Sequence, residues 1–161
     1  MNKRKIFELA EIISKREKIP PELTKAIIMT ESSGDPFADS GYARGLMQIS
    51  EIALKDLELP YSYNDMLDPS KNIEAGVKYL KRLYSFWVWQ LARWHIPEQL
   101  LDALVYNSVI RSYNWGIGNV KEWYSNTKPD NAEIIKTISS ETRDYLHKVD
   151  NWIIKFSKKE V

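Results

Sequence analysis

The feature that most constrains the fold of this chain is a long run of apolar residues at helical spacing. The run begins after Asp68-Pro69 and continues to Pro97, with Ile73, Val77, Leu80, Tyr84, Trp87 and Leu91 as its members. A repeat near 3.6 residues places these side chains on one face of a helix. Aspartate followed by proline is typical of a helix N-terminus, because aspartate caps the first turn and proline is tolerated within it. The sequence therefore predicts one long helix here.

Shorter runs with the same spacing predict further helices, and the alternation typical of strands is weak throughout. The first helix carries Ile6, Leu9, Ile13 and marginally Ile12, and the second runs from Pro21 to Glu31 with Gly34 as its C-terminal cap. The third carries Leu46, Ile49, Ala53 and Leu57. Two more helices cover roughly 98–113 and the residues from about Ser140, and a capping box at Asp130 and Glu133 precedes the last one. A short hairpin is expected, if anywhere, between Pro60 and Leu67. We therefore expect an all-α fold, or α with a minimal hairpin, in a single domain over residues 1–161.

The charge and composition of the chain exclude several classes of function. Basic and acidic residues nearly balance, 23 against 22, and leave a net charge of +1 with no basic stripe, so we expect no nucleic-acid partner. Cysteine is absent, which excludes disulfides, thiolate metal sites and a cysteine nucleophile. The two histidines, His95 and His147, are too few for a histidine-rich metal site. We expect neither a metal nor a cofactor.

The chain contains no segment that we expect to cross a membrane or to direct export. Its N-terminus starts like a signal peptide, but Glu8 and Glu11 interrupt the apolar stretch, so an amphipathic helix is the better interpretation. The most apolar stretch, from Tyr84 to Ile96, contains Arg93 and is too short to span a bilayer. We expect a soluble chain.

Glu31 is the first candidate for chemistry. It follows Ile27 by four residues and Leu23 by eight, so it extends the helical face that packs inward. A carboxyl group there is partly desolvated, and desolvation favours its neutral form. A retained proton is what a general acid donates to a leaving oxygen. Taken alone, however, Glu31 fits an ordinary surface glutamate better.

Four motifs in order raise the significance of Glu31. They are Glu31-Ser32 with Pro36, Ala38 and Ser40, followed by Gly45-Leu46-Met47-Gln48-Ile49; Asn72-x-x-x-Gly76-x-x-Tyr79-Leu80; Ser112-Tyr113-Asn114-Trp115-Gly116-Ile117-Gly118-Asn119-Val120; and Glu141-Thr142-Arg143-x-Tyr145-x-x-Lys148-Val149. Together they resemble the motifs of the soluble lytic transglycosylases, which are related to goose-type lysozyme. The resemblance covers about Pro21 to Val149. It implies a lysozyme-like helical fold with a substrate cleft and cleavage of peptidoglycan glycan strands.

The resemblance also implies roles for individual residues. Glu31 is the expected catalytic acid and base. Ser40, Met47 and Gln48 are expected to line the sugar-binding groove, and Tyr113 and Asn114 to flank the acid. Tyr145 is expected to orient the Glu31 carboxyl group, although its position on a stripe with Val149 and Trp152 also fits a plain core residue.

Three departures from the family pattern bear on these roles. The loop between Ser40 and Gly45 is one residue shorter than usual, and Trp115 and Ile117 replace a small residue and a proline in the third motif. Trp115 either stacks on a sugar or fills space beneath the loop.

The number of acids decides the reaction. Goose-type lysozymes usually carry an aspartate where this chain has Ser50, and aspartates in loops such as Asp35 and Asp39 are usually turn formers. With one acid, the family resemblance implies a transglycosylase that leaves 1,6-anhydro-N-acetylmuramic acid ends. A goose-type or chitinase-like hydrolase that uses water is the alternative. A catalytically silent glycan-binding or structural module is the second alternative.

The expected setting follows from the expected substrate. The partner is peptidoglycan, the place of action is the cell wall or periplasm, and the protein is a monomer. Because no export signal is evident, a phage-encoded lysin and a trimmed exported enzyme both fit. Of the clustered tryptophans, Trp87 suits the core and Trp89 is the better candidate for exposure.

Overall fold

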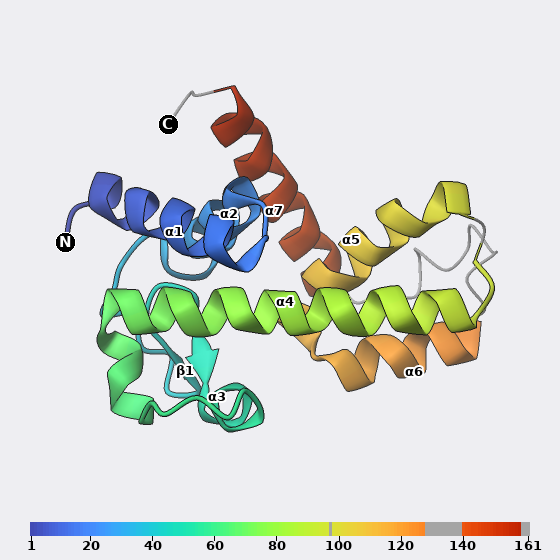
Figure 1. Cartoon of the computed structure of the whole chain (residues 1–161), viewed down its shortest axis with the longest axis horizontal. Coiled ribbons are helices and arrows are strands. Elements are labelled where there is room, and N and C mark those ends of the chain that lie inside the picture. Colours follow the sequence, from blue (N-terminus) through green and yellow to red (C-terminus); the bar gives the residue numbers. More distant parts are fainter. Residues whose placement is uncertain (97, 128–139, 159–161) are drawn as a thin grey trace. The chain divides into compact units, whose positions relative to one another are not determined.

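The computed structural model describes residues 1–96, 98–127 and 140–158. Its elements, drawn in Figure 1, are α1 (Lys3–Glu17), α2 (Pro21–Ser32), β1 (Ala43–Arg44), β2 (Ile49–Ser50), α3 (Glu51–Asp56), the 3-10 helix η1 (Tyr63–Leu67), α4 (Pro69–Arg93), α5 (Glu98–Trp115), α6 (Ile117–Thr127) and α7 (Ser140–Ser157). The predicted fold class, helical with a minimal hairpin, is confirmed. The chain divides into two compact units, Met1–Lys81 with Val149–Val161, and Arg82–Lys148. A single domain over residues 1–161 stays a prediction.

The first unit begins with a pair of packed helices. Helix α1 ends at Glu17 and is capped by Lys18, which adopts a left-handed conformation with φ of 61°. Helix α2 starts at Pro21, a position where proline needs no N–H partner. The Ser14 and Thr24 hydroxyl groups lie 2.8 Å apart in the buried interface between the helices. This hydrogen bond satisfies both polar groups inside an apolar core.

Apolar side chains from most elements of the first unit build its core. Figure 1 shows α1 and α2 on one side of the N-terminal part of α4, with β1 and α3 on the other. Fully or nearly fully buried side chains come from α1 and α2 (Ile6, Ala10, Leu23, Ile27, Ile28), from the turn and β2 (Leu46, Met47, Ile49), from α3 and η1 (Leu54, Met66) and from α4 (Ile73, Val77, Leu80). Ile12, placed marginally on the apolar face, is instead 68% exposed.

The third predicted helix was wrong at its beginning. Residues Ala43–Arg44 and Ile49–Ser50 pair as an antiparallel hairpin, with Ala43 opposite Ser50. Gly45 and Gln48 close the turn with φ of 76° and 47°, values that a helix cannot contain. Helix α3 starts only at Glu51, where the Ser50 side chain caps it.

The predicted hairpin between Pro60 and Leu67 was also wrong, because this segment forms η1. Ser62 and Asp65 make a capping box, in which each side chain accepts from the backbone N–H of the other. Ser-x-x-Asp resembles the usual Ser-x-x-Glu signature of a helix N-terminus, and this signal was missed.

The ends of the remaining helices agree with the sequence in part. Asp68 caps α4 as predicted, accepting from the Lys71 backbone N–H at 2.9 Å. The cap of α2 is Ser33, with φ of 54°, and not Gly34, which follows it. Helix α4 ends at Arg93, short of Pro97. The predicted capping box at Asp130 and Glu133 lies outside the described residues.

The second unit is organised around Trp87. Its side chain is fully buried, as predicted, and its indole N–H donates to the Ser112 hydroxyl group at 2.8 Å. The Tyr124 ring lies 5.4 Å from the Trp87 ring, and the Tyr124 hydroxyl group is 2.9 Å from that of Ser108. The predicted exposure of Trp89 is confirmed at 54%. Among the described residues, no helix is long and apolar enough to cross a membrane.

Candidate active site

Glu31 lies in the last turn of α2, where its side chain is half-buried. One turn earlier on the same helix, Ile27 and Ile28 are fully buried in the core. The Thr30 hydroxyl group donates to the Ala26 carbonyl of the same helix at 2.8 Å. The end of α2 is therefore fixed on its apolar side, and Glu31 stands at the margin of the core, as the sequence predicted.

Ser32 joins the end of α2 to the Gly45-Leu46-Met47-Gln48-Ile49 run. Its hydroxyl group donates to the Leu46 carbonyl at 2.8 Å, and it also lies 3.1 Å from the Ile28 carbonyl. The same oxygen accepts from the Gly34 backbone N–H at 3.2 Å. One side chain thus links the helix that carries Glu31, the turn that follows it and the Gly45–Gln48 turn.

Asn72, on the buried face of α4, holds the Gly45–Gln48 turn in place by hydrogen bonds. Its amide oxygen accepts from the Met47 backbone N–H at 2.8 Å, and its amide nitrogen donates to the carbonyls of Arg44 and Met66 at 2.8 and 2.9 Å. Buried backbone groups need such partners, since an unsatisfied one costs about 1–3 kcal/mol. Asn72 therefore fixes the turn through one fully buried side chain.

Two glycines let the backbone of this site approach its neighbours closely. A Cβ atom on Gly45 would lie 2.1 Å from the Met66 carbonyl oxygen, and one on Gly76 would lie 2.3 Å from the Met47 sulfur. Gly76 follows Asn72 by one helical turn, so the Asn-x-x-x-Gly pattern of α4 provides both the hydrogen bonds and the space that the turn needs. The sequence motif thus has a direct structural explanation.

Met47 and Gln48 point to different environments. Met47 is fully buried against Gly76. Its side chain therefore lies beneath the surface, where it can support the predicted sugar-binding groove from inside. Gln48 is half-buried, and its amide nitrogen donates to the carbonyls of Ala38 and Gly45 at 3.1 and 3.0 Å. Both amide protons are used inside the turn, so only the amide oxygen is left to meet a substrate hydroxyl group.

Ser40 lies in the short loop before β1 and is exposed. Its hydroxyl group accepts from the Ala43 N–H at 3.1 Å and lies 3.2 Å from the Ala43 carbonyl. The loop places Gly41 in the left-handed conformation, with φ of 82°. Ser40 is therefore a turn residue whose side chain faces solvent.

The acidic residues of the same loop are engaged in turn structure. Asp35 accepts from the Phe37 backbone N–H at 2.9 Å. Asp39 accepts from the Gly41 N–H at 2.8 Å and from the Arg44 guanidinium at 2.9 Å, and these hydrogen bonds hold the pKa of the Asp39 carboxyl group below its usual range. Both aspartates act as the turn formers that their loop positions suggested.

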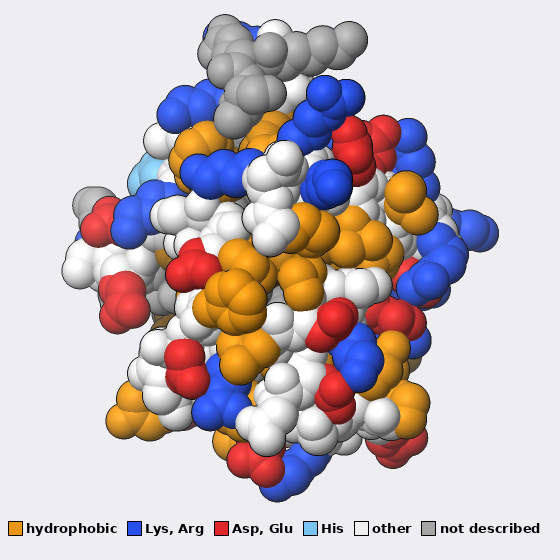
Figure 2. Space-filling model, turned by 90° about the vertical axis from the view of Figure 1, so that its left-hand side faces the viewer, with side chains coloured by type: hydrophobic (Ala, Val, Ile, Leu, Met, Phe, Trp, Pro, Cys, Tyr) orange, Lys and Arg blue, Asp and Glu red, His pale blue; other side chains and the backbone are white. Residues whose placement is uncertain are grey.

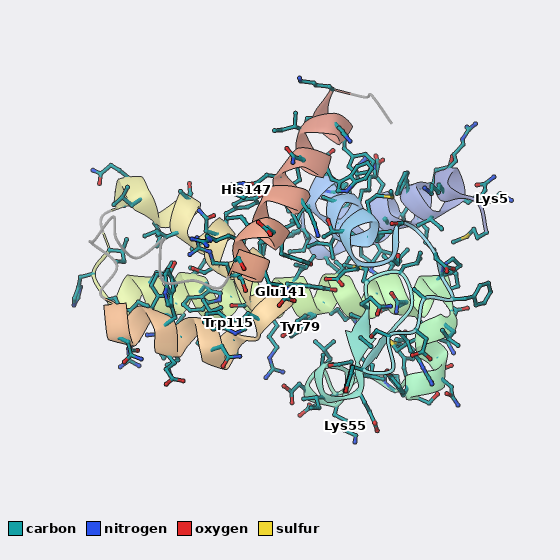
Figure 3. All side chains as sticks on the ribbon, turned by 180° about the vertical axis from the view of Figure 1, so that it is seen from behind. Lys5, Lys55, Tyr79, Trp115, Glu141 and His147 are labelled. Atoms are coloured by element: carbon teal, nitrogen blue, oxygen red, sulfur yellow. The ribbon has the colours of Figure 1, made fainter. Side chains whose placement is uncertain are left out.

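The other predicted site residues belong to the second unit. Tyr113 and Asn114 lie in the last turn of α5, half-buried and exposed respectively, and Gly116 follows with φ of 87°. Asn119 donates to the Trp115 carbonyl at 2.7 Å, which closes the turn between α5 and α6. Tyr145 is 7% exposed on α7. Figure 3 labels Trp115 at the end of α5.

Sequence reasoning did not assign a role to Asn72, which organises the site from 25 residues away. The available signal was an asparagine on the apolar face of a predicted helix, since a buried amide must find hydrogen-bond partners. Among the residues that the structure describes, no group of three or more histidine, aspartate and glutamate side chains is arranged to hold a metal ion.

Comparison with known proteins gives a family and a set of relatives. Residues 8–136 match the family model described as "Transglycosylase SLT domain". The chain is 31% identical to membrane-bound lytic murein transglycosylase C of Edwardsiella ictaluri, over 91% of this chain and 45% of the relative. The protein of the same name from Haemophilus influenzae is also 31% identical, over 95% of this chain and 47% of the relative. This chain thus spans less than half the length of these curated relatives.

Two solved structures have the same fold. The lytic transglycosylase Slt of Pseudomonas aeruginosa, solved as an inactive mutant with glutamine in place of a glutamate, superposes with a TM-score of 0.74 at 23% identity and covers 94% of this chain and 24% of its own. The 70 kDa soluble lytic transglycosylase of Escherichia coli gives a TM-score of 0.69 at 26% identity and covers 93% of this chain and 24% of its own.

Proposed function

Because this chain belongs to the transglycosylase SLT domain family, we propose that it is a peptidoglycan lytic transglycosylase with Glu31 as its catalytic residue. The relatives carry the name lytic murein transglycosylase, which supports the choice of substrate. The observation that carries the proposal is the 2.8 Å hydrogen bond from Ser32 to the Leu46 carbonyl, since it joins the end of α2, which carries the half-buried Glu31, to the Gly45–Gln48 turn.

The proposed reaction uses one carboxyl group twice. Glu31 gives its proton to the glycosidic oxygen as the bond from that oxygen to C1 of N-acetylmuramic acid breaks. The carbonyl oxygen of the substrate's own N-acetyl group assists by bonding to C1. The Glu31 carboxylate then takes the proton of the C6 hydroxyl group, whose oxygen displaces the N-acetyl oxygen and closes the 1,6-anhydro ring. Glu31 ends protonated, as it began, and no water is consumed.

The remaining predicted residues have supporting roles in this proposal. The Gln48 amide oxygen accepts from a sugar hydroxyl group, because its amide protons are held by the turn. Ser40 offers an exposed hydroxyl group, and the buried Met47 supports the turn from beneath. Tyr113 and Asn114 bind substrate beside the acid, and Tyr145 orients the Glu31 carboxyl group; these three roles rest on the family motifs.

A single-acid mechanism is favoured over hydrolysis because the nearby aspartates are already engaged. An inverting hydrolase needs a second carboxylate to activate water. Asp39 is bonded to Gly41 and Arg44, and Asp35 to the Phe37 N–H, so neither is a ready base. Ser50, where goose-type lysozymes usually have aspartate, is the cap of α3.

Digestion of purified peptidoglycan followed by mass spectrometry tests the reaction. We expect products with 1,6-anhydro ends. Each is lighter than the corresponding hydrolysis product by the mass of one water, about 18 mass units, because ring closure adds no water. Glu31→Gln should lower the rate of cleavage by about 10²–10⁴-fold, because general acid–base catalysis contributes about that much. Products with reducing ends only would change the assignment to a hydrolase.

The matched control for Glu31→Gln is Glu22→Gln. Glu22 is also half-buried, on the first turn of the same helix, so the two substitutions remove the same charge from one element. We expect Glu22→Gln to keep full activity and both variants to keep the circular dichroism spectrum of the unmutated chain. Full activity of Glu31→Gln would overturn the mechanism.

The proposed place of action is the cell wall, with the protein as a monomer. The relatives are named membrane-bound murein enzymes, which supports action at the wall. A phage-encoded lysin and an exported bacterial enzyme both remain compatible with this proposal. Light scattering after size exclusion tests the oligomeric state, and a dimer would contradict the monomer.

A further inference from the structure

A pocket beside α3 is separate from the residues assigned to catalysis. Its volume is about 350 Å³, and its lining includes Glu51, Leu54, Lys55, Glu58, Tyr61 and Tyr63. All of them lie in the first unit, in α3, in the segment that leads into η1 and, for Tyr63, at the start of η1 itself. Lys55 projects from the side of α3 that faces away from α4 (Figure 3). We call this cavity the α3 pocket.

Two tyrosine rings of the α3 pocket are held in place by contacts with charged side chains. The Tyr61 hydroxyl group donates to the Glu74 carboxylate at 2.9 Å, and this hydrogen bond, with burial, raises the pKa of the Tyr61 hydroxyl group. The Arg44 guanidinium lies 4.4 Å from the centre of the Tyr63 ring. Arg44 is itself fixed by Asp39 at 2.9 Å and by Asn64 at 2.8 Å.

Fixed aromatic rings are suited to bind a flat apolar surface at low entropic cost. Ordering a side chain on binding costs about 0.5–1.5 kcal/mol, and these rings are already ordered. Both are half-buried, so part of each ring remains accessible. The rings therefore offer a prepared binding surface, with Leu54 and Leu59 as further apolar lining.

The polar groups of the α3 pocket carry charges of both signs. Glu51 and Lys55 form an ion pair at 3.0 Å whose side chains are 57% and 74% exposed. Such an exposed pair contributes little to stability, so its members can turn to a ligand at small cost. Carboxylates accept from hydroxyl groups and an ammonium group donates to them. A neutral ligand with many hydroxyl groups matches this lining better than an ion of either sign.

Glu58 adds a second, independent observation. It follows the end of α3 with φ of 52°, a left-handed position where helices usually have glycine or asparagine. A residue with a side chain is strained there, and strain of this kind often occurs at ligand sites. The strained position supplies the α3 pocket with a carboxylate that glycine would lack.

We infer that the α3 pocket binds a sugar unit of the glycan strand at a distance from the bond that is cleaved. The choice of glycan as the ligand rests on the proposed function, since the strand is a polymer with many equivalent units. The pocket volume lies in the range of small-molecule sites, about 300–1,000 Å³. A second contact on the same strand would raise its effective affinity for the enzyme.

The test uses the full chain with Glu31→Gln, which slows turnover by about 10²–10⁴-fold, and soluble peptide-free glycan strands as the probe. Backbone amide resonances are followed by NMR during titration, and affinity is measured by calorimetry. We expect shift changes in residues 51–63. Addition of Glu58→Gly should abolish these changes and weaken overall binding by about three- to tenfold, the loss of one or two polar contacts.

Lys18→Gly in the same Glu31→Gln background is the matched control. Lys18 also stands in the left-handed conformation after a helix of the first unit, with φ of 61°, and does not line the α3 pocket. Both substitutions relieve the same backbone strain, so a loss of binding seen only with Glu58→Gly comes from the pocket. Equal binding by the two variants, or shift changes that leave residues 51–63 untouched, would overturn the inference.

The two proposals can fail separately. Anhydro products from the unmutated chain without glycan binding at residues 51–63 would remove the α3 pocket and leave the proposed function. Glycan binding at residues 51–63 without any cleavage product would remove the proposed function and leave a glycan-binding module.

Discussion

The Gly45–Gln48 turn and the α3 pocket both contain residues in the left-handed conformation, but the surroundings of Gly45 and Glu58 differ in kind. Gly45, with φ of 76°, is packed so tightly that a Cβ atom would meet the Met66 carbonyl oxygen at 2.1 Å. Glu58, with φ of 52°, keeps an exposed side chain on the wall of a cavity. The first position excludes a side chain to hold a backbone in place, whereas the second keeps one at an energetic cost.

The two regions also differ in the groups that hold them in place, which are neutral in the turn and charged around the α3 pocket. The turn is held by neutral groups, namely the Asn72 amide, the Ser32 hydroxyl group and backbone carbonyls. The segment that lines the α3 pocket is held by charged groups at the surface, including Asp65. Figure 2 shows acidic and basic side chains interspersed over the face it presents. We conclude that the turn is a rigid support, whereas the α3 pocket combines two fixed tyrosine rings with an exposed ion pair that can turn to a ligand.

The largest expected effect is that of Gly45→Ala. The new methyl group meets both the Met66 carbonyl and the Asn72 side chain, and alanine also resists the left-handed conformation. We expect a loss of about 3–4 kcal/mol in the free energy of unfolding, measured by urea denaturation. Gly41→Ala is the control, because Gly41 has φ of 82° but no atom within 4 Å of its Cβ position. A loss for Gly45→Ala no greater than for Gly41→Ala would contradict the tight packing of the turn.

Asn72→Ala should have the next largest effect. It removes three hydrogen bonds and leaves the Met47 N–H and the Arg44 and Met66 carbonyls without them, so we expect a loss of about 2–3 kcal/mol. Cleavage activity should fall as well, since the turn beside Glu31 loses its support. The control is Asn64→Ala, an exposed asparagine bonded to Arg44, with an expected change within about 0.5 kcal/mol. Equal changes for the two variants would show that the turn does not depend on Asn72.

These differences explain what the sequence could predict. The long helix α4 and the burial of Trp87 follow from apolar periodicity, which is a local property of the chain. Leu46 and Ile49 also stand three residues apart and imitate that pattern, so a helix was predicted where the chain forms a hairpin. Nothing in the apolar pattern signals the positive φ of Gln48.

The candidate site shows the same limit. Glu31 could be placed at the margin of the core because helical spacing alone defines that face. The motifs named Asn72, but its hydrogen bond to Met47 joins residues 25 apart and depends on tertiary packing. Tyr61 and Tyr63 gave no signal at all, because the rings become a binding surface only when Glu74 and Arg44 fix them.

A smaller effect of opposite sign is expected for Glu58→Gly. Replacement of a strained left-handed residue by glycine should stabilise the chain by about 0.5–1 kcal/mol, since the relief of strain exceeds the added chain entropy. Lys18→Gly should stabilise it by a similar amount, and the two should add because the sites are independent. The measurement is urea denaturation of the single and double variants. Destabilisation by Glu58→Gly alone would mean that the Glu58 side chain makes contacts that outweigh the strain.

The smallest expected effect is a difference in acid sensitivity between the two regions. Hydrogen bonds from Lys71 and from the Ser62 hydroxyl and N–H groups lower the pKa of Asp65 to about 2, from 3.8. Because the folded pKa lies below the unfolded one, the stabilisation is complete above about pH 4 and is lost as the pH falls toward 2. The amide resonance of Ser62 should therefore shift between pH 4 and pH 2, and Asp65→Asn should remove this titration. The Met47 amide, which donates to the neutral Asn72, should not follow it. If Met47 titrated together with Ser62, the turn would not be the independent support that its neutral hydrogen bonds indicate.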